Sequence, residues 1–89
     1  MEDILKSKLS ATAKSFWYGV GVKIQKRVKG VVQVLYNEIT NSIVIKIFFE
    51  KFNYIINTEF PCSKLLEESF VVNSVLNSVR FNIVEELFE

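Results

Sequence analysis

The chain has 89 residues, of which 49% are hydrophobic, and its 11 basic and 10 acidic side chains give a net charge of +1. This length predicts one domain, residues 1–89, with one small core. Neither of its longest apolar stretches approaches the roughly 18 to 20 residues of a membrane span, and the N-terminal residues lack the basic and apolar blocks of a secretory signal. Because Cys62 is the only cysteine, we expect a protein of a reducing compartment, the cytoplasm.

The charge is unevenly distributed along the chain. Residues 1–36 hold seven basic and two acidic side chains, a net charge of +5, whereas residues 37–89 hold four basic and eight acidic ones, a net charge of −4. One interpretation is a nucleic-acid-binding patch on the basic half. We favour the other, in which the two halves lie against each other or against a second copy and partly neutralise each other.

The N-terminal part of the chain predicts a helix over residues 2–19. Apolar residues recur at helical spacing from Leu5 through Leu9 to Phe16, and two acidic residues precede them, where the helix dipole favours negative charge.

Two glycines, Gly19 and Gly21, argue against a longer helix, because each would cost about 1 kcal/mol in its interior. The alternating residues 20–24 suit a short strand instead. A helix that continues and is capped by Gly30 is the alternative.

Three runs rich in Val, Ile and aromatic residues predict strands at residues 31–39, 43–49 and 52–60. The polar pairs between them, Thr40-Asn41 and Glu50-Lys51, predict tight two-residue turns and therefore an antiparallel meander.

These turns predict the register of the sheet. They place Ile45 between Tyr36 and Ile56, so that one face of the sheet is apolar on all three strands. The opposite face is also rich in apolar side chains, namely Leu35, Ile39, Val44, Phe48 and Ile55. Either two helices cover the two faces, or one face meets another molecule.

After Pro61, helical periodicity extends over residues 64–89, with Ser63 as the expected N-cap. A core-facing stripe within about 80° of arc is formed by Leu65, Val72, Leu76, Val79, Ile83 and Leu87. A second apolar set, about 100 to 160° round the helix, comprises Leu66, Phe70, Phe81, Val84 and Phe88. One sheet cannot cover both sets, so either the helix breaks near residues 79–82 or a partner covers the second set.

The sequence offers little for catalysis. It has no histidine, which removes the usual general base and the commonest nitrogen ligand of zinc. Cys62 before the predicted helix has no base to activate it, and adjacent glutamates on a helix diverge rather than converge on a substrate. No phosphate-binding glycine loop is present. We therefore expect neither enzymatic activity nor a metal or cofactor.

One basic cluster lies near three aromatic residues, Phe16, Trp17 and Tyr18. Its members are Lys23, Lys26, Arg27 and Lys29. Cations neutralise phosphates and aromatic rings stack on unpaired bases, so this segment supports a nucleic-acid-binding alternative. We expect the aromatic trio to be core or interface. We expect no membrane-surface helix, because its apolar stripe is narrow.

The predicted fold is α+β, with an N-terminal helix, an antiparallel meander of three or four strands, and a long or broken C-terminal helix. This element order resembles that of many small phage and mobile-element accessory proteins, some of which block host enzymes or defence complexes. The expected function is a non-catalytic protein-binding module that forms a dimer or docks on a larger protein. The predicted partner-binding residues are Phe70, Phe81, Val84, Phe88, Leu35 and Phe48.

Overall fold

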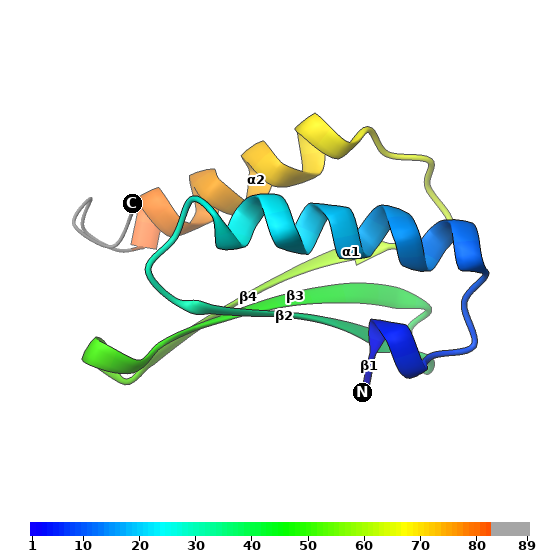
Figure 1. Cartoon of the computed structure of the whole chain (residues 1–89), viewed down its shortest axis with the longest axis horizontal. Helices are drawn as coiled ribbons and strands as arrows, with labels where there is room; N and C mark the ends of the chain where they lie inside the picture. Colours follow the sequence, from blue (N-terminus) through cyan, green and yellow to red (C-terminus); the bar gives the residue numbers. More distant parts are fainter. Residues whose placement is uncertain (83–89) are drawn as a thin grey trace.

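A computed structural model describes the backbone of residues 1–82 and the side chains of residues 1–80. Its elements in chain order are β1 (Glu2–Asp3), η1 (Ile4–Lys6), α1 (Ala11–Gln25), β2 (Val31–Asn37), β3 (Ser42–Phe49), η2 (Glu50–Phe52), β4 (Tyr54–Pro61) and α2 (Glu68–Asn82). The strands form an antiparallel sheet in the order β1-β2-β3-β4, and both helices lie on the same side of it (Figure 1). The predicted α+β fold is confirmed.

Helix α1 begins later than the sequence pattern predicted. Ser10 is its N-cap, and its hydroxyl oxygen accepts a hydrogen bond from the Ala13 N–H at 3.2 Å. Serine is a much better cap than interior residue, because its side chain satisfies an otherwise unpaired N–H. The predicted start at residue 2 is therefore wrong, and residues 2 and 3 instead pair with β2 as a short strand, β1, that the sequence did not predict.

Helix α1 also ends later than predicted, so the strand at residues 20–24 is wrong and the alternative of a continuing helix is correct. The reason lies at Gly21, where the helix approaches the sheet so closely that a β-carbon would lie 2.8 Å from Val34 Cγ2. A glycine that costs stability in an isolated helix here allows close packing. Lys26, rather than Gly30, is the C-cap.

The three predicted strands are confirmed as β2, β3 and β4, but their register differs from the prediction by two residues. Ile43, rather than Ile45, lies opposite Tyr36, and Ile56 lies opposite Ile47. A shift of two residues keeps every side chain on its predicted face, because side chains alternate along a strand.

The shift has its origin in the loops, each of which has four residues rather than two. Asn41 and Asn53 end the two loops in the left-handed region, with φ of 48° and 49°. Asparagine tolerates this conformation, whereas a two-residue turn with both central residues at positive φ needs a pair such as Asn-Gly. The Asn37 side chain also accepts hydrogen bonds from the N–H groups of Ile39 and Thr40 and so starts the first loop early.

The core lies between the sheet and the two helices. Its largest fully buried side chains are Phe49, Ile24, Ile43, Ile45, Ile47, Val20, Val28, Val71, Val75 and Val79. The β-branched residues of β3 supply much of this list because β3 is central in the sheet and covered by both helices.

Helix α2 buries part of its predicted stripe. Val72, Leu76 and Val79 are buried as expected, whereas Leu65 is fully exposed and precedes the helix. The predicted N-cap Ser63 is wrong, because α2 begins at Glu68. The sequence left open a break near residues 79–82 as one of two alternatives, and the described part of α2 runs without a break from Glu68 to its last described residue, Asn82. Two other predicted stripe residues, Ile83 and Leu87, lie outside the described residues.

We expect the variant Thr58→Val to be more stable than the wild type by about 1 kcal/mol. The Thr58 hydroxyl oxygen is buried on the helix side of β4 and has no hydrogen-bond partner, so valine removes an unsatisfied polar atom at nearly constant volume. Urea denaturation measures the difference. Thr40→Val is the control, because the Thr40 hydroxyl bonds to the Ser42 hydroxyl and its loss brings no gain. A loss of stability in Thr58→Val would contradict the prediction.

Candidate protein-binding surface

The sheet has an outer face that no described helix covers. Along each strand, alternate residues point towards the helices, and those between them form the outer face. The residues facing the helices include the buried Val34, Ile45 and Ile56, so their neighbours in sequence lie on the outer face. Because α1 and α2 pack on one side (Figure 1), the alternative in which two helices cover the two faces of the sheet is wrong for the described residues.

Three apolar side chains lie in one line across this outer face, and we call them the apolar row. Val31 on β2 pairs with Phe48 on β3, which pairs with Ile55 on β4. Val31 is 57% exposed and Ile55 is 48% exposed, while Phe48 between them is half-buried. Contiguous exposed apolar side chains rimmed by polar residues are typical of protein-interaction sites.

A second line contains Leu35, which is half-buried, and Val44, which is buried. The polar residues Gln33, Lys46 and Asn57 separate this line from the apolar row. The predicted partner-binding residues Leu35 and Phe48 therefore share the outer face but do not form one patch within a single chain.

The other predicted partner-binding residues lie elsewhere. Phe70 is exposed, but it belongs to α2 in the opposite layer of the molecule. Only the backbone of Phe81 is described, as part of α2, while Val84 and Phe88 lie outside the described residues. The structure thus keeps Phe70 apart from Leu35 and Phe48.

Sequence reasoning missed Val31 and misplaced Ile39. Val31 is the most exposed member of the apolar row, and its position directly across from Phe48 follows only from the true register. Ile39 was expected on the sheet face, but it lies in the four-residue loop and is almost fully exposed.

The basic cluster lies at the end of α1 and in the loop after it. Lys23 forms an ion pair with Glu68 of α2, so one of the four positive charges of the basic cluster is already neutralised. The others, Lys26, Arg27 and Lys29, are exposed near the helix C-terminus, where cations interact favourably with the helix dipole.

The three aromatic residues near this cluster do not form a stacking platform. Trp17 is buried and its ring lies 5.8 Å from that of Phe60 between centroids, and Phe16 meets Trp17 edge-on at 5.1 Å. Tyr18 alone of the trio is exposed. The trio was expected to be core or interface; Trp17 belongs to the core, and the half-buried Phe16 packs against it.

Cys62 is half-buried, and desolvation raises the pKa of its thiol. Because α2 begins six residues later, the helix dipole does not offset that increase. Cys62 also lines a groove of about 320 Å³ whose walls include Leu9, Phe16 and Leu66. A raised pKa keeps the thiol protonated, which is the opposite of an activated nucleophile.

Within residues 1–82, no group of three or more acidic or cysteine side chains is placed to hold a metal ion. None of the helices in this part of the chain is long and apolar enough to cross a membrane. Comparisons with protein-family models, with curated proteins and with solved structures found no match for this chain.

Proposed function

We propose that this chain is a small non-catalytic protein-binding module that uses the outer face of its sheet. The observation that carries the proposal is the position of both helices on one side, which leaves the apolar row open. The row has the anatomy of an interface core, since polar residues of the sheet flank it. Burial of Val31 and Ile55 by a partner would remove their exposed apolar area from water and so favour association.

The partner in this proposal is another protein, either a second copy or a larger protein in the cytoplasm. The form of the function that we propose is that of a phage or mobile-element accessory protein, which inhibits a host enzyme or defence complex by occupying one of its surfaces. The shared element order supports this form. Nucleic-acid binding by the basic segment has less support, because Lys23 is ion-paired and Trp17 is buried.

The test is a comparison of Val31→Asp with wild type for capture of protein partners from the source cells, measured by quantitative mass spectrometry. We expect capture to fall at least about tenfold, because the carboxylate would have to be desolvated at the interface. The Val31 side chain points to solvent, so the free energy of unfolding should change by no more than about 1 kcal/mol.

Ile39→Asp is the matched control, since it places the same charge at an exposed apolar residue outside the row. It should capture partners as the wild type does. Equal capture by all three proteins, or an equal loss in both variants, would contradict the use of the outer face.

A further inference from the structure

The two edges of the sheet differ in how far their main-chain groups are paired. At the β2 edge, β1 pairs with Tyr36 and Leu35, and the Gln25 side chain pairs with the main chain further along. The Gln25 amide donates to the Gly30 carbonyl at 2.6 Å and accepts from the Val32 N–H at 3.0 Å, as a strand would.

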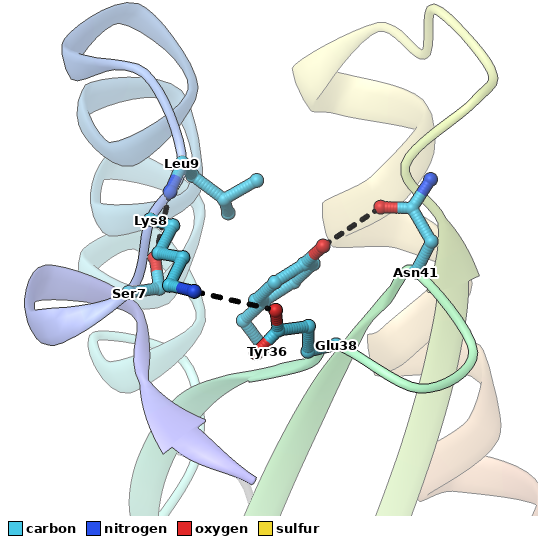
Figure 2. Close-up of polar contacts among 6 residues, drawn as sticks. All are labelled: Ser7, Lys8, Leu9, Tyr36, Glu38 and Asn41. Atoms are coloured by element: carbon cyan, nitrogen blue, oxygen red, sulfur yellow. Dashed lines mark hydrogen bonds and ion pairs between the residues drawn. The ribbon is translucent and has the colours of Figure 1, made fainter.

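The N-terminal segment adds one further contact at the end of β2. Figure 2 shows Lys8 reaching Glu38 in the loop after β2, at 3.6 Å. The figure also shows a contact within the β2–β3 hairpin, in which the Tyr36 hydroxyl donates to Asn41 at 2.9 Å. The β2 edge is thus covered along much of its length. At the opposite edge, β4 is the last strand among residues 1–82, and nothing in this range pairs with its outer side.

The main-chain groups on the open β4 edge follow from the ladder with β3. The Cys62 N–H donates to the carbonyl of Asn41, the residue directly before β3. Every second residue of β4 counted back from Cys62 therefore directs its N–H and carbonyl groups towards β3, and the main-chain groups of the residues between them point to the open edge. The outward-facing residues are Ile55, Asn57, Glu59 and Pro61. Proline is tolerated in sheets where its missing N–H faces away from a partner strand, which is its position here.

Most of this edge lacks the devices that usually prevent pairing. Edge strands commonly carry lysines, prolines or bulges, or are very short, and the single proline of β4, Pro61, is its last residue. β4 has eight residues, an unbroken ladder with β3 and a single charged side chain, Glu59. The Glu59 carboxylate is engaged by the Ser42 hydroxyl at 2.6 Å, which draws it back towards β3.

We propose that a second copy of this chain covers the β4 edge, with the two β4 strands antiparallel and Asn57 opposite Asn57. In this register, Ile55 of each copy exchanges hydrogen bonds with Glu59 of the other, and the two Asn57 residues exchange theirs. All three outward N–H groups of each copy are then satisfied. The inference goes beyond the proposed function, since it concerns the sheet edge and not the outer face.

The strand itself selects this register. A register shifted by two residues in one direction places Ile55 of one copy opposite Pro61 of the other, and proline has no N–H to donate. The same shift in the other direction places Glu59 opposite Asn53, which has left the strand in a left-handed turn. The register centred on Asn57 also keeps the Glu59 carboxylates of the two copies apart. It sets Tyr54 of one copy opposite Phe60 of the other, an aromatic cross-strand pair.

The pairing closes on itself. A two-fold axis at Asn57 uses the β4 edge of both copies, and the edges that remain are the β2 edges already covered by β1 and Gln25. It therefore gives a dimer and not a fibre. The apolar row of one copy also continues, through Ile55 and Glu59, into the line that holds Val44 and Leu35 of the second copy. Leu35 and Phe48, separated within one chain, then lie in one line across the dimer.

Cysteine cross-linking tests the register. In a Cys62→Ser background, Asn57→Cys should form a disulfide-linked dimer under mild oxidation, because directly opposite residues have Cα atoms about 5.5 Å apart, within disulfide range. Ile55→Cys alone should not cross-link, because the two copies of residue 55 are displaced by about 13 Å along the strands. A mixture of Ile55→Cys and Glu59→Cys should give the mixed dimer. Equal cross-linking of Ile55→Cys and Asn57→Cys, or none for Asn57→Cys, would overturn the proposal.

Light scattering tests the dimer without a covalent bond. The wild type should show the mass of two chains at high protein concentration, and Asn57→Pro should weaken the dimer by more than about tenfold. The Asn57 N–H faces outwards, so proline there removes no bond to β3, and circular dichroism should show the native fold. A monomeric wild type, or a folded Asn57→Pro that stays dimeric, would overturn the proposal.

The two proposals fail separately in these experiments. Val31→Asp lies two strands away from the β4 edge and should remain a dimer while it loses protein partners. A monomeric Val31→Asp would show that the dimer forms through the outer face and would overturn the edge pairing. Loss of partner capture with the dimer intact would leave both proposals supported.

Discussion

Trp17→Ala is expected to lower the free energy of unfolding by about 3 to 5 kcal/mol. Trp17 is only 7% exposed, and its ring packs against Phe16 and Phe60. Alanine would leave a cavity between α1 and β4 that neighbouring residues cannot fill without leaving their own contacts. Domains of this length have a total stability of roughly 4 to 13 kcal/mol, so the variant should be close to unfolding.

Urea denaturation followed by circular dichroism measures this loss, and Tyr18→Ala is the control. Tyr18 is adjacent in sequence and 54% exposed, so its truncation should cost less than about 1 kcal/mol. The comparison of these two variants also distinguishes a core-packing role of Trp17 from a role in stacking on bases. If Trp17→Ala were as stable as Tyr18→Ala, the ring would be free for another use, such as stacking on bases, and its assignment to the core would be wrong.

Gly30→Ala is expected to lower the free energy of unfolding by about 2 to 3 kcal/mol. A β-carbon at this position would lie 2.9 Å from Ile47 Cγ2, 2.9 Å from the Phe48 carbonyl oxygen and 3.0 Å from Phe49 Cδ1. The carbonyl belongs to the central strand and cannot move without disturbing its ladder. The start of β2 would have to shift instead, and with it the hydrogen bond from Gln25 to the Gly30 carbonyl.

Gly19→Ala is the matched control for this substitution. Its added methyl group would meet only the end of the Glu68 side chain at 3.4 Å, and Gly19 lies inside α1. Alanine there should raise stability by up to about 1 kcal/mol, the difference in helix propensity. The two variants should thus move the urea midpoint in opposite directions. A Gly30→Ala protein as stable as the wild type would contradict the close approach of the loop to β3.

The candidate surface could be predicted in part. Phe48 and Ile55 were placed on the second face of the sheet because period-two alternation assigns faces without knowledge of the register. Val31 was missed because its partner in the row depends on the length of the loop, which two left-handed asparagines set at four residues. Phe70 was grouped with these residues on hydrophobicity alone, and only the layer in which α2 lies separates them.

The sequence by itself determined the class of the fold, the three long strands, the face of each of their side chains, and the buried positions Val72, Leu76 and Val79 of α2. These are local properties, because they follow from alternation, helical periodicity and β-branched side chains within a few residues.

The tertiary structure decided the rest. Gly21 is unfavourable in a helix taken alone, and α1 extends through it because a close approach to Val34 brings more burial than the glycine costs. Residues 2 and 3 became a strand because the edge of β2 was there to pair with. The placement of both helices on one face, which leaves the apolar row and the β4 edge open, results from contacts between segments far apart in the chain, and no local pattern encodes it.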